Sequence, residues 1–243
     1  MKIVGIIQAR TNSKRLPNKV LLKLGDKTIL NILIERLLFS KMLDEVIVAT
    51  TNNVGDDPIV GIAKNHGVGV FRGSEEDVLD RFYKAALEFK ADVVVRITAD
   101  NPLTDVNLMD YMVNVLIEGN YDYVAPKDII LGLGSEIISF RALEITWKSA
   151  IKKYQREHVT PYIYEHPKKF RIKYVEAPGE LVGRDIRLTI DAEKDYELLL
   201  KLYEELGDLV EIDVYDIVRF LIEHPNIRVI NSNIKQKPYW RPD

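Results

Sequence analysis

Four short apolar runs alternate with segments of helical periodicity over the first hundred residues. These runs lie at 3–7, 45–51, 68–71 and 92–98. Each is nearly continuous in apolar character and too short for an ordinary helix, which is typical of strands buried on both faces. Strands that alternate with helices over short links form parallel sheets with right-handed crossovers. The sequence therefore predicts an α/β fold built on a parallel sheet.

The rest of the chain continues this architecture less regularly. Periodicity predicts helices at 28–38, 57–66, 74–90, 106–119, 142–152, 156–165, 192–206 and 214–223. Further strands are predicted at 121–125, 136–140, 170–177 and 187–190, and the polar segment 226–243 is interpreted as a surface arm. The 243 residues contain no repeat and no linker rich in Gly, Ser or Pro, so a single domain spanning 1–243 is expected.

Composition narrows the classes of partner. Lys and Arg number 34 against 37 Asp and Glu, a formal net charge of −3, so no overall basic field favours nucleic acid. The absence of cysteine excludes disulfides, thiolate metal sites and cysteine nucleophiles. No apolar run is long enough to cross a bilayer, and the start lacks a signal-peptide pattern. We expect a cytoplasmic protein that binds neither nucleic acid nor membranes.

A cationic segment follows the first predicted strand. Arg10, Lys14, Arg15 and Lys19 are interleaved there with turn-forming residues, so backbone N–H groups and cations can converge on one anion. The carboxyl end of a strand in an α/β sheet is also where such folds bind ligands. The alternative is a solvated basic loop, and Lys14 is interpreted in that way. The glycines of the chain match neither a Walker A loop nor a dinucleotide-binding motif.

Five blocks carry a resemblance to a known family: QARTNSKRLPNKVLLKLGDKTIL (8–30), RGSEEDVLDRF (72–82), RITADNPLTD (96–105), REHVTPYI (156–163) and RLTIDAEKD (187–195). In this order they resemble the cytidylyltransferases that make CMP-activated sugars, and within that group the spore coat polysaccharide biosynthesis type. The resemblance implies a three-layer nucleotidyltransferase fold, glycosyltransferase-A-like and Rossmann-like, with a mostly parallel central sheet. It also implies a nucleotide-binding half at about 1–105 and a sugar-binding and dimerisation half at about 106–243. A homodimer is expected to use part of 128–164.

The resemblance assigns the nucleotide to two segments. The residues implied to bind it are Gln8, Ala9, Arg10, Ser13, Arg15, Lys19, Arg72, Gly73 and Ser74. Arg10, Ser13, Arg15 and Lys19 are implied to contact phosphates, with Lys19 at the α-phosphate, and 72–74 to form the cytosine pocket. The alternative for 72–74 is a glycine turn before a helix that a capping box of Ser74 and Asp77 opens.

Two carboxylates follow predicted strands. Asp100 comes directly after 92–98 and Asp191 after 187–190. By resemblance both bind Mg²⁺, which proteins usually hold with one or two carboxylates, substrate phosphates and water. The resemblance makes Arg10, Lys19 and Asp100 the catalytic residues. The alternatives are a turn residue and, for Asp191, a helix cap. The sequence Asp100-Asn101-Pro102 lacks the Asp-x-Asp pattern of metal-dependent glycosyltransferases.

The acceptor side rests on fewer observations. Glu136, Arg156, His158 and Arg187 fall in blocks that resemble the sugar-facing half of the family. Arg156 and Arg187 would suit an acidic sugar, because a guanidinium pairs with a carboxylate through two hydrogen bonds. A structural role is as good an interpretation of Glu136 and His158. Asp77 and Arg81 are predicted to form a surface pair four residues apart on a helix.

These patterns predict a cytidylyltransferase. It would transfer CMP from CTP to an acidic sugar of the sialic acid or 2-keto kind, with Mg²⁺ as cofactor and pyrophosphate as the second product, for surface polysaccharide or glycoconjugate synthesis. A sugar phosphate or alditol phosphate is the alternative acceptor. The alternative outside enzymes is a nucleotide-binding regulator, against which the paired carboxylates argue, because binding alone does not need them.

Overall fold

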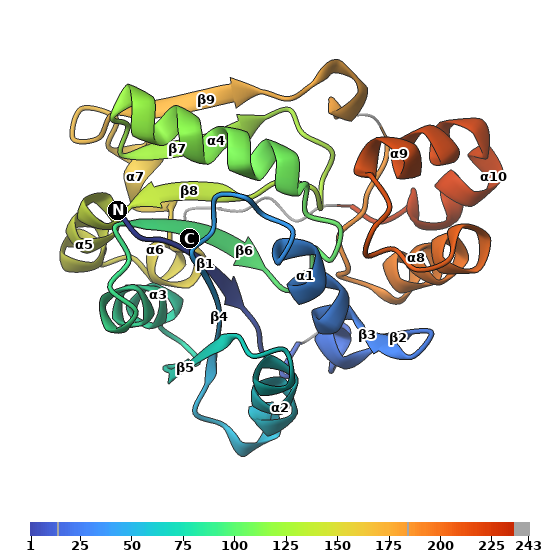
Figure 1. Ribbon diagram of the computed structural model, residues 1–243, viewed down its shortest axis with the longest axis horizontal. Coiled ribbons are helices and arrows are strands. Elements are labelled where there is room, and N and C mark those ends of the chain that lie inside the picture. Colours follow the sequence, from blue (N-terminus) through green and yellow to red (C-terminus); the bar gives the residue numbers. More distant parts are fainter. Residues whose placement is uncertain (14, 184, 236–243) are drawn as a thin grey trace.

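A seven-stranded sheet forms the centre of the protein (Figure 1). The computed structural model describes residues 1–13, 15–183 and 185–235. The strand order is β5-β4-β1-β6-β8-β7-β9, and only β8 is antiparallel to its neighbours. The bounds are Ile3–Gln8 (β1), Glu45–Thr51 (β4), Gly69–Gly73 (β5), Val93–Thr98 (β6), Tyr123–Lys127 (β7), Glu136–Ser139 (β8) and Ile172–Glu176 (β9). The expected mostly parallel sheet is confirmed.

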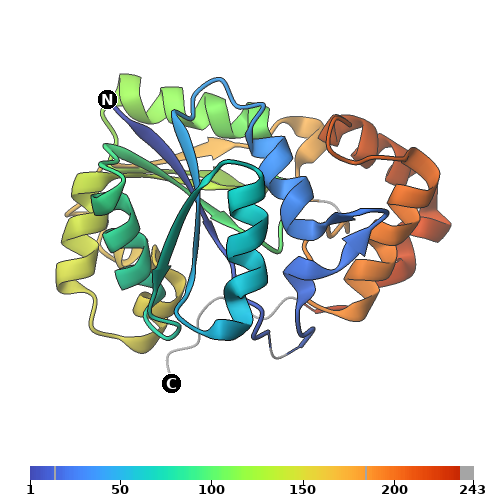
Figure 2. The same ribbon diagram turned by 60° about the horizontal axis from the view of Figure 1, so that its bottom comes forward.

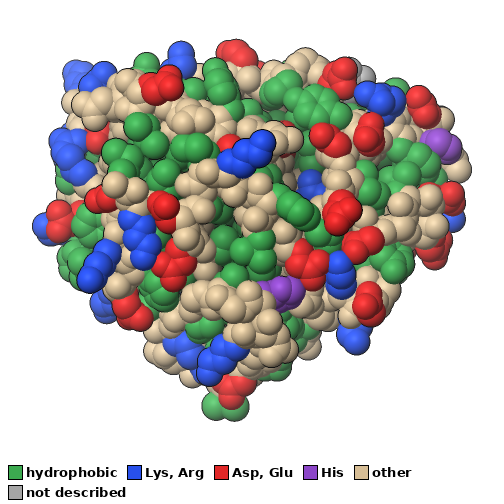
Figure 3. Space-filling model, in the orientation of Figure 1, with side chains coloured by type: hydrophobic (Ala, Val, Ile, Leu, Met, Phe, Trp, Pro, Cys, Tyr) green, Lys and Arg blue, Asp and Glu red, His purple; other side chains and the backbone are tan. Residues whose placement is uncertain are grey.

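Helices cover both faces of this sheet, which gives three layers. One face carries α1 (Ile29–Leu37), α2 (Asp57–Asn65) and α4 (Val106–Gly119), and Figure 1 shows α4 lying along β7 and β8. The opposite face carries α3 (Val78–Glu88), α5 (Phe140–Ser149), α6 (Lys153–His158) and α7 (Pro161–Glu165). Figure 3 shows acidic and basic side chains intermixed on the face that α4 covers.

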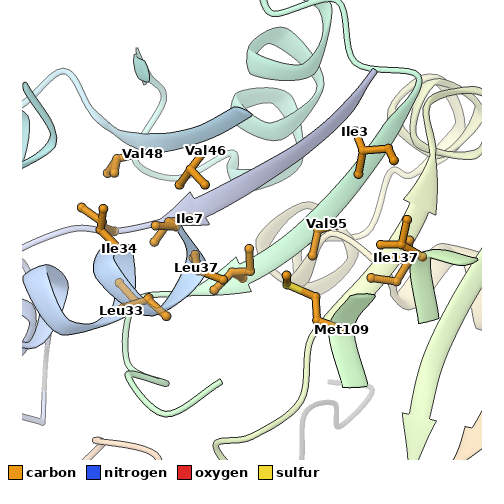
Figure 4. Close-up of a cluster of buried hydrophobic side chains, with 14 of the residues drawn as sticks. Ile3, Ile7, Leu33, Ile34, Leu37, Val46, Val48, Val95, Met109 and Ile137 are labelled. Carbon is orange, nitrogen blue, oxygen red and sulfur yellow. The ribbon is translucent and has the colours of Figure 1, made fainter. Parts of the chain in front are cut away.

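The apolar runs fold as strands because both of their faces are buried. Ile7 on β1 points toward α1, where Leu33, Ile34 and Leu37 lie at helical spacing, and Ile3 belongs to the same buried cluster (Figure 4). Thr28 opens α1, because its side chain accepts a hydrogen bond from the Asn31 backbone N–H at 3.2 Å. The central strands are thereby fixed, and their carboxyl ends lie at one edge of the sheet.

A separate helical unit lies beside this edge (Figure 2). It comprises α8 (Glu193–Leu206), α9 (Val214–Glu223) and α10 (Pro225–Arg228), which pack on α1 and on the ribbon of β2 (Lys23–Leu24) and β3 (Lys27–Thr28). Gly25 turns this ribbon with φ +62°, and a Cβ there would overlap the Tyr203 hydroxyl of α8. The buried Arg36 of α1 donates from one terminal nitrogen to the carbonyl oxygens of Leu209, Val210 and Ile212 at 2.7, 3.1 and 2.9 Å.

Several predicted elements agree with the structure at both ends, namely the strand at 45–51 and the helices at 106–119 and 214–223. The predicted helix at 74–90 begins only at Val78, because Asp77 is its N-cap and accepts from the Asp80 N–H at 2.9 Å. Ser74 accepts from the Asp77 N–H at 3.0 Å, which is one of the two bonds of the predicted capping box, but the N-cap of α3 is Asp77 and not Ser74.

The predicted helix at 156–165 is two helices. Val159, fully buried with φ +71°, ends α6, and Pro161 starts α7. The predicted strand at 187–190 is reduced to one bridge between Leu131 and Arg187.

The predicted surface arm is also wrong in part. Residues 225–231 form α10 and a 3-10 turn (Val229–Asn231) with Ile227 and Asn231 buried. The rest of the arm, 236–243, lies outside the described residues. Among the described helices, none combines the length and the apolar character needed to cross a bilayer.

The buried face of β1 generates a stability prediction. Ile7→Ala removes a side chain with no solvent exposure and should cost about 2–5 kcal/mol of unfolding free energy. The matched control is Ile151→Ala, because Ile151 is 89% exposed and its loss should change stability by no more than about 0.5 kcal/mol. Urea unfolding of both variants measures the difference. Equal effects would show that this face of β1 is not a core face.

Candidate active site

The loop after β1 closes on the carbonyl oxygen of Thr11. Ser13 and Asn18 donate their backbone N–H groups to this oxygen at 2.8 and 2.9 Å. Asn18 adopts φ +57°, a conformation that asparagine tolerates better than most residues. Ala9 is buried and donates its N–H to the Ala49 carbonyl at 3.2 Å. The loop is thus a fixed turn at the carboxyl end of a central strand. Lys14 lies outside the described residues.

Asp56 fixes this loop through hydrogen bonds between its carboxylate and Thr11. Its carboxylate, 1% exposed, accepts from the N–H and hydroxyl of Thr11 at 2.8 and 2.7 Å, and from the Thr51 hydroxyl at 2.5 Å. Burial alone would raise the pKa of Asp56, but the hydrogen bonds from Thr51 and Thr11 hold it below its ordinary value. The sequence analysis missed Asp56, because nothing in Gly55-Asp56-Asp57 distinguishes a loop anchor from a helix start.

Glu75 ties the same loop to the turn after β5. It accepts from the side-chain amides of Asn12 and Asn53 at 2.9 and 2.5 Å, and Arg10 lies 3.8 Å away. The phosphate-loop candidate and the base-pocket candidate therefore share a carboxylate. These contacts place the loop after β1 beside the segments that follow β4 and β5.

Lys19 joins the two predicted metal carboxylates. Its ammonium lies 2.7 Å from Asp100 Oδ2 and 3.2 Å from Asp191 Oδ1, and it also donates to the Ile190 carbonyl at 2.8 Å. Arg15 reaches the same Asp191 oxygen at 2.8 Å. The structure thus brings Lys19, Arg15, Asp100 and Asp191 together from three distant segments.

Arg187 orients Asp191 from the other side. Its guanidinium donates to Asp191 Oδ2 at 2.8 Å and to Asp195 Oδ1 at 2.8 Å. Burial would raise the pKa of Asp191, but the charges of Lys19 and Arg15 hold it below its ordinary value. Arg187, predicted to face the sugar, lies instead beside a predicted metal ligand.

Asp191 does not cap α8. The N-cap residue is Ala192, and Asp195 accepts from the backbone N–H groups of Asp191 and Ala192 at 2.9 and 3.0 Å. The cap alternative for Asp191 is therefore wrong. The sequence analysis missed Asp195. Its position four residues after Asp191 could have indicated that the two residues lie close together.

The donor set of this cluster fits Mg²⁺. Asp100 and Asp191 each direct one oxygen to a single cationic group, the Lys19 ammonium, so they are close enough to share a small cation. No group of three or more metal-ligating side chains occurs among the described residues. Phosphate oxygens and water would complete the coordination, as is usual for Mg²⁺.

The segment 72–74, where β5 ends, is held by two arginines. Arg72 donates to the carbonyls of Thr51 and Asn53 at 2.8 and 2.6 Å and to Asp57 at 2.6 Å, so its guanidinium holds the segment after β4. Ser74 accepts through its carbonyl from the buried Arg81. A Cβ on Gly73 would come within 3.1 Å of the Arg81 side chain.

Arg81 was predicted to form a surface pair with Asp77, and this is wrong. It is 2% exposed, and burial together with the nearby charge of Arg10 lowers its pKa to about 10. Asp77 pairs instead with Arg156, whose Nε lies 3.0 Å from both carboxylate oxygens. The bidentate pairing foreseen for Arg156 thus exists, but with a carboxylate of the chain.

The other acceptor candidates lie together on the face that α6 and α7 cover. Glu136 on β8 accepts from Arg96 on β6 and from the Tyr123 hydroxyl on β7. His158 ends α6 near this group, and burial lowers its pKa, so its imidazole is neutral at pH 7. Gln8, at the end of β1, has a buried side-chain oxygen without a partner among the described residues.

Comparisons with known proteins agree with this geometry. The family model described as cytidylyltransferase matches residues 4–216. The spore coat polysaccharide biosynthesis protein SpsF of Bacillus subtilis is 36% identical over 92% of this chain and 95% of its own. A solved cytidylyltransferase from Leptospira borgpetersenii is 35% identical, with a TM-score of 0.88 over 98% of this chain and 100% of its own. A 3-deoxy-manno-octulosonate cytidylyltransferase of Bdellovibrio bacteriovorus is 36% identical over 49% of this chain and 47% of its own.

The anchoring of the loop by Asp56 generates a pH-dependent prediction. Asp56→Asn should lower the unfolding free energy at pH 7 by about 1–3 kcal/mol, because the buried donors of Thr11 and Thr51 lose a charged acceptor. The folded pKa of Asp56 is lowered, so its carboxylate stabilises the fold above the unfolded pKa. This contribution is lost as the pH falls through the folded pKa.

Urea unfolding at pH 7 and in acid measures this effect. The difference between Asp56→Asn and the parent should shrink in acid. Asp216→Asn is the control, because Asp216 is 62% exposed in a surface pair and should show neither effect. A difference that persists unchanged in acid would contradict the assignment.

The place of Lys19 generates a prediction about metal binding. Lys19→Met removes the cation between Asp100 and Asp191, so MgCl2 without nucleotide should raise the melting temperature of this variant more than that of the parent. A stabilisation of 1 kcal/mol corresponds to about 2–4 °C for a chain of this size. Lys19→Met combined with Asp191→Asn is the control and should lose the added response. NaCl of equal ionic strength separates specific binding from screening, and equal MgCl2 responses of Lys19→Met and the parent would contradict a shared cation site.

Proposed function

Since the chain belongs to the cytidylyltransferase family, we propose that it transfers CMP from CTP to an acidic, 2-keto sugar of the sialic acid kind, with Mg²⁺ bound. Membership makes it a CTP-dependent nucleotidyltransferase that acts on sugars. The observation that carries the proposal is the cluster in which Lys19 contacts both Asp100 and Asp191.

The proposed reaction is a displacement at phosphorus. The anomeric hydroxyl oxygen of the sugar forms a bond to the α-phosphorus of CTP, and the bond from that phosphorus to the bridging oxygen breaks. Pyrophosphate leaves with the electron pair, and the hydroxyl proton passes to solvent. In such transfers positioning and charge stabilisation supply most of the rate. Lys19 and Arg15 would place two positive charges beside the reacting phosphates.

Asp100 and Asp191 would hold the metal ion, and Arg187 would keep the Asp191 carboxylate in one orientation. Bound Mg²⁺ would neutralise triphosphate charge and favour departure of pyrophosphate. The Asp56 and Glu75 anchors would keep the loop in place before the nucleotide arrives. A preformed loop lowers the ordering cost of binding.

The cytosine would lie against the turn at 72–74. Because the Arg72 guanidinium is held by Thr51, Asn53 and Asp57, Arg72 would shape this pocket rather than read the base with its side chain. The turn precedes α3, so the backbone at Gly73 and Ser74 is available to hydrogen-bond the edge of a base.

The acidic acceptor is supported by the Bdellovibrio bacteriovorus relative, whose name gives a sugar acid as its substrate. The proposal extends to a role in surface polysaccharide synthesis, as the name of the Bacillus subtilis relative indicates. It also includes a cytoplasmic homodimer that uses part of 128–164, a segment in which Ile151 is 89% exposed.

A pyrophosphate-release assay tests the proposal. The panel pairs CTP, UTP, ATP and GTP with 3-deoxy-manno-octulosonate, N-acetylneuraminate, mannose 1-phosphate and glycerol phosphate. We expect release with CTP and a sugar acid, and a loss of about 100-fold or more in Asp191→Asn, which lacks the metal-binding charge. Asp216→Asn should retain full activity.

Each alternative has its own outcome in this assay. Preference for a sugar phosphate or glycerol phosphate would overturn the acidic acceptor. Preference for UTP, ATP or GTP would overturn the base assignment. Nucleotide binding by calorimetry without release from any pair would favour the regulator without turnover.

A further inference from the structure

Arg96 is a charged residue in the middle of an otherwise apolar central strand. It lies on β6 opposite Glu136 of β8, and one terminal nitrogen of its guanidinium donates to Glu136. Tyr123 of β7 donates its hydroxyl to the other oxygen of the same carboxylate. Three neighbouring strands thus build one polar group on the face that α3, α5, α6 and α7 cover.

This group is incompletely satisfied. The side chain of Arg96 is only 14% exposed. Its Nε is buried and has no hydrogen-bond partner among the described residues. An unmatched donor on a buried charge is costly, and it calls for an explanation such as a bound ligand or a water molecule. The side-chain oxygen of Gln8 is also buried and has no hydrogen-bond partner among the described residues. Gln8 lies on the adjacent strand β1, opposite Thr98 of β6. Two unmatched polar atoms thus lie on the same face of two neighbouring strands.

This place lies beside the proposed reaction centre. Arg96 lies two residues, about 7 Å, before the carboxyl end of β6 at Thr98, and Asp100 follows in the turn after that strand. The nucleotide side lies on the same face, because Arg10 and Glu75 are near Arg81 of α3. A sugar attached to the α-phosphate beside Lys19 would therefore reach toward Arg96.

The two arginines predicted for the acceptor carboxylate are engaged elsewhere. Arg156 pairs with Asp77 through both carboxylate oxygens, and Arg187 pairs with Asp191 and Asp195. Arg96 keeps a donor for which the described residues provide no acceptor. Of the arginines on the face that α3, α5, α6 and α7 cover, Arg96 lies on a central strand and is not engaged in a bidentate pair.

We propose that Arg96 and Glu136 recognise the acceptor, with Arg96 donating to the carboxylate of a sugar acid and Glu136 accepting from a neighbouring hydroxyl. Tyr123 fixes the Glu136 carboxylate in this arrangement. The pair selects a molecule that carries an anion and a hydroxyl side by side, which describes a 2-keto sugar acid. This inference rests on the proposed function and adds the residues that choose its substrate.

Steady-state kinetics with CTP and the better of 3-deoxy-manno-octulosonate and N-acetylneuraminate test the pair. Arg96→Gln should lower kcat/KM for the acceptor by roughly 10- to 100-fold, the effect expected for a charge-assisted hydrogen bond. The dissociation constant of CTP, measured by calorimetry, should stay within about twofold of the parent, because the proposal assigns CTP to other residues, namely those of the loop after β1 and of 72–74. Arg96→Lys keeps the charge and should recover part of the loss.

Two further variants keep the test decisive. Arg96→Gln combined with Glu136→Gln removes both charges, so no carboxylate is left buried without its partner. This double variant should fold and bind CTP, but its kcat/KM for the acceptor should still be reduced. Arg141→Gln makes the same chemical change at an arginine that is 66% exposed in a pair with Asp122, and it should match the parent.

The outcomes separate this inference from the proposed function. If the parent uses a sugar acid and the Arg96 variants use it equally well, Arg96 and Glu136 form a structural ion pair. The inference is then overturned while the proposed function stands. Losses of CTP affinity as large as the loss of acceptor kcat/KM would overturn it as well. A parent that turns over no sugar acid overturns the acidic acceptor, and the inference falls with it.

Discussion

The attraction between one ammonium group and two carboxylates organises the functional end of this protein. Asp100 and Asp191 come from segments 91 residues apart in sequence, and like charges at such close range repel unless a cation lies between them. Lys19 supplies that cation. The sheet order makes the contact possible, because β1 and β6 are adjacent and their carboxyl ends place Lys19 and Asp100 at one edge. Asp191, which lies just before α8, reaches the same ammonium group.

The sequence predicted the parts of this site that follow from local order along the chain. Continuous apolar runs mark the central strands, and residues directly after such strands, such as Asp100, must lie at the ligand-binding edge. The resemblance to cytidylyltransferases added Lys19 and Asp191, which the structure brings into contact with each other. The position of Asp100 could be predicted because the order of strands in a parallel sheet constrains where their ends lie.

What the sequence could not provide were the partners of charged residues. A spacing of four favoured Asp77 with Arg81, but Asp77 pairs with Arg156, 79 residues away, while Arg81 is buried. Asp56 and Arg96 were missed for the same reason, because their roles depend on contacts with Thr11 and Glu136 across the fold. Helix periodicity likewise carried through Val159, since the positive φ that ends α6 there leaves no mark in the pattern of apolar residues.

The carbonyl contacts of Arg36 have a consequence for how this sequence can change. Arg36 holds the segment that carries Leu209, Val210 and Ile212 through backbone oxygens, which every amino acid possesses. The side chains of that segment can therefore be exchanged for others of similar volume without loss of the clamp. The segment can therefore accumulate substitutions over evolutionary time while its attachment to α1 is kept. One arginine thus holds this segment against α1 independently of the identity of the residues that it binds.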